Sequence, residues 1–283
     1  MGNVSGLIVD MTDILVHWKE YFDNDAKGED MWGHYKTANG DLYVVADGAS
    51  THEDSKTGED VVKFIDDKLK QEAKNISRRT HVAELIRSIN TESARVNEGA
   101  YAAIAGILHR KHSLFAFGAG DVSVLAKKPN GKLIQILPLD LNIEKEEAEE
   151  TAKTEIGTII NGREITQENH IKRSQQLMHH GLCNAVGIGE SFYLNEASFN
   201  TKDGAVILIA SDGIIDPFVT IQKEAGAIQK TGAEKIYEVI NSSETAEEAV
   251  EALKDLIWDT QVKEKIKIKS DDRTGIFLYM NAS

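Results

Sequence analysis

Three short apolar segments that resemble β-strands are each bordered by an aspartate, and this repeated pattern most constrains how the chain can fold. One such segment, residues 42–46, precedes Asp47, a second precedes Asp212, and a third follows Asp271. Strand ends are held rigidly by their sheet, so carboxylates placed there can converge without depending on mobile loops. We therefore expect these acids to meet at one rim of a sheet.

Hydrophobic periodicity gives the fold class. Strand-like runs at 31–37 and 41–46 flank an Asn39-Gly40 turn signal, and helical spacing follows from Gly58 and over residues 82–89. Three short β-like runs between 101 and 126, with a fourth at 133–137, resemble an antiparallel meander. A continuous apolar strand at 205–210, a helix at 247–257 and a last strand at 275–280 complete the pattern. Strands and helices occur in separate blocks rather than in strict alternation. This order predicts an α+β protein, a sheet sandwich flanked by helices.

Charge and composition exclude several classes. The 283 residues carry 32 basic and 46 acidic side chains, a net charge of −14, which argues against nucleic acid or an anionic membrane as partner. The only cysteine, Cys183, cannot form an internal disulfide, and this favours a reducing, cytoplasmic compartment. With three prolines and no linker-like segment, residues 1–283 are expected to form a single domain.

Carboxylates crowded at one rim repel each other, and bound hard cations relieve that repulsion. Oxygen-only ligands without a histidine cluster indicate Mg²⁺ or Mn²⁺ rather than zinc. For any single aspartate, a plain turn residue after a strand is an equally good interpretation, because Asp-Gly is common turn chemistry. The combination is more specific than its parts.

Four ordered motifs resemble the metal-dependent protein phosphatases of the protein phosphatase 2C type. They are residues 42–48 (LYVVADG), 115–121 (FAFGAGD), 207–216 (ILIASDGIID) and 270–276 (SDDRTGI). Glu29-Asp30 and Asn184-Ala185-Val186-Gly187 resemble two further motifs, so the likeness runs from about residue 24 to the C-terminus. The resemblance implies a β-sandwich of two antiparallel sheets flanked by helices.

The resemblance also implies a binuclear Mg²⁺/Mn²⁺ centre and hydrolysis of phosphoserine or phosphothreonine in a phosphoprotein by a metal-activated water. By the family pattern, Asp47 bridges both metals, and Asp212 and Asp271 complete the second. The Gly48 carbonyl, and Glu29 through a water, bind the first metal in this pattern. Asp121 and Asp216 match a weaker third metal position. The particular phosphoprotein and the oligomeric state stay open.

The sequence departs from the family pattern at positions that bind the substrate phosphate or protonate the leaving group. Asp25 stands where the family has a phosphate-gripping arginine, and an acid there would repel a phosphate. Lys27 could substitute, although a solvated loop lysine is the plainer interpretation. Ala49 replaces a histidine proposed as general acid in eukaryotic members, leaving protonation of the leaving group to a metal-bound water or to His52. An inactive phosphatase-like binding protein is therefore the alternative, although every expected acid is present.

The segment from about 140 to 186 is polar and irregular, and it corresponds to the family's variable flap. Such an insert contributes little core and is expected to contact substrate. Lys172 and Arg173 are its candidate binding residues, with a solvated surface helix as the alternative interpretation.

Overall fold

The computed structural model describes most of the predicted elements. The described residues are 6–8, 16–23, 28–50, 57–110, 113–127, 131, 133–137, 159–160, 163–164, 166, 184–201, 204–215, 230–262 and 272–280.

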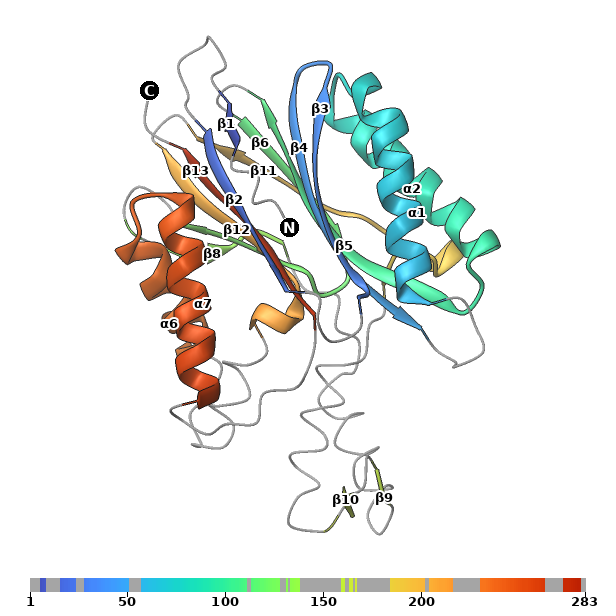
Figure 1. Ribbon diagram of the computed structural model, residues 1–283. Helices are drawn as coiled ribbons and strands as arrows, with labels where there is room; N and C mark the ends of the chain where they lie inside the picture. Colours follow the sequence, from blue (N-terminus) through green and yellow to red (C-terminus); the bar gives the residue numbers. More distant parts are fainter. Residues whose placement is uncertain are drawn as a thin grey trace.

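Two antiparallel sheets face each other (Figure 1). One has the order β11-β6-β5-β4-β3, formed by Asn195–Asn200, Ser113–Ala119, Ala100–Arg110, Gly40–Ser50 and Asp30–Thr37. The other has the order β1-β2-β13-β12-β7-β8, formed by Gly6–Ile8, Val16–Asp23, Arg273–Met280, Ala205–Ala210, Ser123–Lys127 and Leu133–Gln135. A separate two-stranded ladder pairs β9 (Ile159–Ile160) with β10 (Arg163–Glu164).

Helices cover the outer face of each sheet (Figure 1). α1 (Gly58–Glu72) and α2 (Arg79–Val96), joined by a short 3₁₀ turn, pack on the five-stranded sheet. α6 (Lys230–Ser242) and α7 (Ala246–Val262) pack on the six-stranded sheet. Each helix pair encloses an apolar layer against its sheet, and a further apolar layer lies between the two sheets. Tyr43, Ile107 and Ile209 belong to this central layer. The predicted sandwich with flanking helices is confirmed.

Local sequence explains where α1 begins. Thr57 is its N-cap: the Thr57 hydroxyl accepts a hydrogen bond from the Asp60 amide, and the Asp60 carboxylate accepts one from the Thr57 amide. This capping box satisfies two amides that would otherwise lack partners. Val61, Val62, Ile65 and Leu69 then form the buried face of the helix, as their spacing predicts.

Three details of the sequence interpretation are wrong. The hairpin loop is Ala38-Asn39, because Gly40 already pairs with Thr37. Asp47 does not follow its strand but lies within β4, which continues to Ser50. The expected meander is divided, because β6 and β7 belong to different sheets and the chain crosses between them at residues 120–122.

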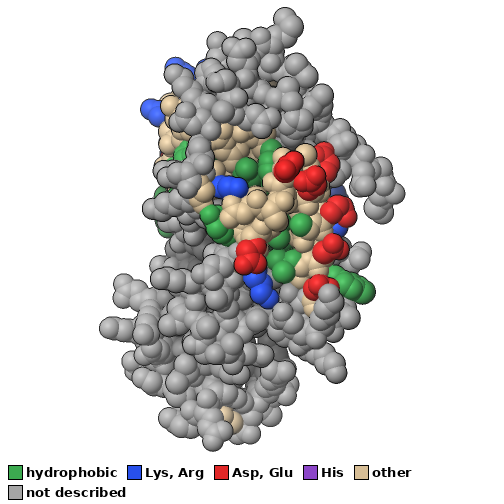
Figure 2. All heavy atoms as spheres, turned by 90° about the vertical axis from the view of Figure 1, so that its left-hand side faces the viewer, with side chains coloured by type: hydrophobic (Ala, Val, Ile, Leu, Met, Phe, Trp, Pro, Cys, Tyr) green, Lys and Arg blue, Asp and Glu red, His purple; other side chains and the backbone are tan. Residues whose placement is uncertain are grey.

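The outer surface of α6 and α7 is acidic (Figure 2). Its exposed acids are Glu238, Glu244, Glu247, Glu248, Glu251 and Asp255, and Trp258 is exposed beside them. This surface would repel a phosphate backbone, in agreement with the net charge. No helix among the described residues is long and apolar enough to cross a membrane.

Candidate metal centre

The candidate site lies at the end of the sandwich opposite the β3–β4 turn. Asp30 opens β3 and is the register partner of Asp47 on β4. The Gly48 amide donates to the Glu29 carbonyl at 3.0 Å, so Glu29 and Gly48 form the hydrogen-bonded pair next to them. Asp30 and Asp47 therefore form a non-hydrogen-bonded pair, the kind in which cross-strand side chains lie closest. Strand alternation places both carboxylates on the face that looks toward the other sheet.

The second sheet contributes two more acids. At its facing end, the Ser211 amide donates to the Thr274 carbonyl at 2.9 Å, and the Thr274 amide donates to the Ser211 hydroxyl at 3.0 Å. These bonds fix the end of β12 against the start of β13. Asp212 follows directly in a short helical turn, and the buried Asp272 directly precedes β13.

Gly213 shows how closely these two chain segments approach. A Cβ atom at Gly213 would lie 1.9 Å from the Asp272 carbonyl oxygen, so only glycine fits at this position. The Glu29 amide donates to the Asp272 carboxylate at 2.7 Å, which ties the two sheets together at the site.

The fifth acid, Asp121, lies in the segment that crosses from one sheet to the other between β6 and β7. Gly120, with φ of +101°, makes the bend after β6, and Asp121 follows it. The negative charge of Asp121 raises the pKa of Asp47, which shows that the two carboxylates lie near each other. The segment that the meander prediction placed within one sheet is therefore the one that positions Asp121 at the site.

Glu29 bridges the site to α1. Its carboxylate accepts a hydrogen bond from the Gly58 amide at 3.2 Å, at the positive end of the helix dipole. A Cβ atom at Gly58 would lie 2.3 Å from the Gly48 carbonyl carbon, so the start of α1 rests against β4.

The electrostatics of the cluster are those of crowded anions. Burial raises the pKa of Asp47 well above its ordinary value, and the neighbouring carboxylates of Asp30, Asp212 and Asp121 raise it further. Burial likewise raises the pKa of Asp30 to about 7, with Asp272 and Asp212 adding to the effect. The hydroxyls of Ser211 and Thr274 lower the Asp30 pKa, but they do not outweigh burial. Without a cation, this end of the molecule favours protonated carboxyls.

The donor set fits a hard divalent cation. Every acidic group in it offers oxygen, and the buried Oδ2 of Asp30 has no hydrogen-bond partner among the described residues. In the described part of the chain, however, no three acidic, histidine or cysteine side chains are already arranged as a ligand set. The predicted ligand Asp271 lies outside the described residues.

The structure brings together Glu29, Asp47, Gly48, Asp121 and Asp212 of the predicted site. Asp216, Lys27, His52, Lys172 and Arg173 lie outside the described residues, as does most of the 140–186 segment. Sequence reasoning did not assign Asp30 or Asp272 to the site. Their signal was the doubling of acids at Glu29-Asp30 and Asp271-Asp272.

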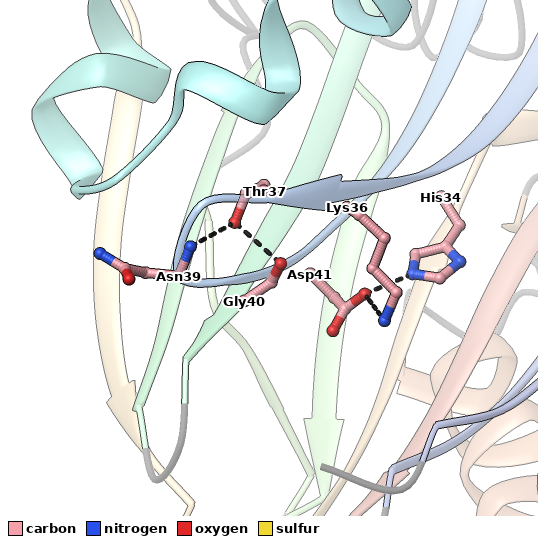
Figure 3. A network of polar contacts seen from close by, with 6 residues as sticks. All are labelled: His34, Lys36, Thr37, Asn39, Gly40 and Asp41. Carbon is pink, nitrogen blue, oxygen red and sulfur yellow. Dashed lines mark hydrogen bonds and ion pairs between the residues drawn. The ribbon is translucent and has the colours of Figure 1, made fainter.

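A second polar cluster lies near the turn end of the same hairpin and has a structural role (Figure 3). The Asp41 carboxylate lies 2.7 Å from both His34 Nε2 and Lys36 Nζ. Burial raises the pKa of Asp41, but the bonds to His34 and Lys36 prevail and lower it. His34 also stacks on Tyr43, with ring centroids 4.8 Å apart. These contacts hold β3 and β4 in register.

A two-sheet sandwich with acids from both sheets at one end is the arrangement expected of a metal-dependent phosphatase. The family profile of protein phosphatase 2C matches residues 20–257. The chain therefore belongs to the protein phosphatase 2C family. No curated protein matches it significantly.

Solved structures agree on the fold at low sequence identity. The serine/threonine phosphatase Stp1 from Staphylococcus aureus is 18% identical over 99% of both chains, with a TM-score of 0.64. The catalytic domain of PstP, in complex with two manganese ions, is 17% identical over 95% of this chain and 99% of its own, with a TM-score of 0.63. The chain is also similar to PppA of Pseudomonas aeruginosa, at 17% identity over 94% and 97% of the two chains and a TM-score of 0.57.

Proposed function

We propose that this protein is a metal-dependent serine/threonine phosphatase that hydrolyses phosphoserine or phosphothreonine in phosphoproteins. The observation that carries the proposal is the convergence of Asp30, Asp47, Asp121, Asp212 and Asp272 at one end of the sandwich. Such a cluster is costly for a protein that binds no cation, because buried like charges repel. Family membership supports phosphate-ester hydrolysis as the use of those cations.

In this proposal the cofactors are two Mg²⁺ or Mn²⁺ ions, in line with the two manganese ions of the similar PstP domain. Asp47 would contact both ions, Asp212 and Asp271 one, and Glu29 and the Gly48 carbonyl the other. Asp121 and Asp216 would serve a weaker third site. Two such ions, when bound, lower the pKa of a shared water and stabilise charge on a phosphate.

The protein's own contribution is positioning. The β3–β4 register fixes the spacing of Asp30 and Asp47, and the Ser211–Thr274 bonds fix Asp212 against the start of β13. The Gly58 amide orients the Glu29 carboxylate. These contacts are all made by strands or by a helix end, so the ligands need little reorganisation when a cation binds.

We further propose one domain over residues 1–283, with a substrate-contacting flap at about 140–186. A cytoplasmic location stays a prediction from the single cysteine.

Hydrolysis of a small aryl phosphate and of a phosphothreonine peptide tests the proposal, with Mn²⁺, with Mg²⁺ and with excess chelator. Turnover that requires either metal is the expected result. A second candidate, a phosphatase-like binding protein, is favoured by Asp25 in place of the phosphate-gripping arginine. Metal binding without turnover of either substrate would support that candidate and overturn the enzymatic proposal.

A further inference from the structure

Tyr101 lies near Asp121 of the carboxylate cluster and is not among the proposed metal ligands. It is the second residue of β5, and its register partner on β4 is Ala49, two residues beyond Asp47. Asp47 itself pairs with Ala103. Because strand residues alternate between faces, Tyr101 and Ala103 point to the same side of the sheet as Asp47. Tyr101 is thus the diagonal neighbour of Asp47, about 7–8 Å away and within reach of a long side chain.

The hydroxyl of Tyr101 is available to a ligand. The side chain is only half-buried, and within the described part of the chain the hydroxyl makes no hydrogen bond. Burial raises the pKa of Tyr101, and the negative charge of nearby Asp121 raises it further. The phenol therefore keeps its proton at neutral pH and can act as a neutral donor.

Backbone contacts with residues 186–187 fix the position of the Tyr101 main chain. Val186 and Ala102 exchange backbone hydrogen bonds at 2.8 and 2.9 Å, and a Cβ atom at Gly187 would lie 3.2 Å from the Tyr101 Cα. Asn90 of α2 accepts a bond from the Gly187 amide at 2.9 Å and donates one to the Gly189 carbonyl at 2.9 Å. This packing limits the directions in which the Tyr101 ring can point.

Among the described residues, the charged groups that act most strongly on Asp47 are themselves acidic, so they would not donate to a phosphate when ionised. The Tyr101 hydroxyl is a neutral donor that no described residue engages, so it can donate to a phosphate oxygen.

We propose that Tyr101 is a substrate-binding residue whose hydroxyl donates a hydrogen bond to an oxygen of the phosphate held at the carboxylate cluster. The inference rests on the proposed function and adds to it a specific contact on the substrate.

The test compares Tyr101→Phe with the wild type, because this change removes the hydroxyl and keeps the ring. The matched control is Tyr237→Phe on α6, where the lost hydroxyl bonds to the Gly131 carbonyl on the far side of the six-stranded sheet. Three quantities are measured: the Kd of inorganic phosphate for the Mn²⁺-loaded protein, the Kd of Mn²⁺ itself, and KM and kcat for a small aryl phosphate.

We expect Tyr101→Phe to weaken phosphate binding and raise KM by about 10–100-fold, the effect of one hydrogen bond to a charged ligand, with Mn²⁺ affinity unchanged. The control should leave all three quantities near wild type. Unchanged phosphate affinity in Tyr101→Phe would overturn the inference. Weakened Mn²⁺ binding would overturn it as well, because Tyr101 would then support the metal site. If the wild type binds phosphate but hydrolyses nothing, the proposed function fails while the phosphate measurement still decides the role of Tyr101.

Discussion

Asp30 and Asp47 face each other across β3 and β4 as a non-hydrogen-bonded pair, with both carboxylates directed between the two sheets. Like charges placed directly opposite each other destabilise a sheet. Here the pair lies in a buried position, and the pKa of each carboxyl is raised. The arrangement is unfavourable for the metal-free protein and becomes favourable when a cation is shared.

Replacing Asp47 with Asn should therefore have opposite effects on activity and on metal-free stability. We expect turnover of an aryl phosphate to fall by more than about 100-fold, because the residue central to the cluster is lost. In chelator, the variant should melt at a higher temperature than the wild type, since a buried anionic repulsion is gone. Mn²⁺ should raise the wild-type Tm more than the variant Tm. Equal Mn²⁺ shifts in the two proteins would place the metal elsewhere.

The stability of the metal-free protein should fall as pH rises from about 4 to about 7. The folded state holds a proton on Asp30 up to a pKa of about 7, whereas an ordinary aspartate releases it near 3.8. The unfolded chain therefore binds fewer protons in this window, and stability decreases with pH. The contribution is a few kcal/mol, on the order of 1.4 kcal/mol per pKa unit.

Urea denaturation in chelator across this pH range, compared with Asp30→Asn, measures that contribution. The variant should show a flatter profile than the wild type. Parallel profiles for the two proteins would mean that Asp30 does not bind the proton. Saturating Mn²⁺ should remove most of the difference between them, because cation binding competes with protonation.

Gly58→Ala should destabilise the protein although alanine favours helices. The added Cβ would lie 2.3 Å from backbone of β4, so α1 must shift, at a cost of about 1–3 kcal/mol. Activity should fall too, because the Gly58 amide holds the Glu29 carboxylate. Glu59→Ala, at the next and exposed position, is the control. If the two variants have equal unfolding free energies, the start of α1 can move without cost.

The 140–186 segment gives a prediction about substrate size. The double change Lys172→Ala and Arg173→Ala should lower kcat/KM for a phosphoprotein about 10-fold, and for a small aryl phosphate much less, because only the large substrate can reach the flap. Equal losses on both substrates would indicate that the pair only supports the fold. No loss on either would place recognition elsewhere.

The sequence predicted the elements whose side-chain pattern is set by burial on one face or on both. β12 is almost entirely buried and was visible as an apolar run, and α1 was visible from its helical spacing. β11 was not predicted. It is an edge strand in which partly buried and exposed residues alternate, and Asn, Glu and Ser occupy much of it. Its pattern therefore resembles that of a surface loop.

Glu29, Asp47, Asp121 and Asp212 could be assigned to the site from the sequence, but Asp30 and Asp272 could not, and neither could the pairing of the acids. Asp30 and Asp47 are 17 positions apart, and only the hairpin register sets them opposite each other. Asp272 contacts the Glu29 amide across 243 positions. Contacts of this kind depend on how the two sheets pack, which no local pattern encodes. The sheet crossing at Gly120 was missed for the same reason.

The hairpin of β3 and β4 connects the turn to the site through a fixed number of residues. Asp30 and Asp47 form the eighth residue pair counted from the Ala38-Asn39 loop. The contacts of Asp41 with His34 and Lys36 stabilise the register near the turn. Inserting or deleting one residue within either strand would rotate every side chain beyond that point to the opposite face. One of the two aspartates would then point toward α1 instead of its partner. Changes of strand length in this hairpin, even at the end remote from the acids, should thus be as damaging as changing the acids themselves.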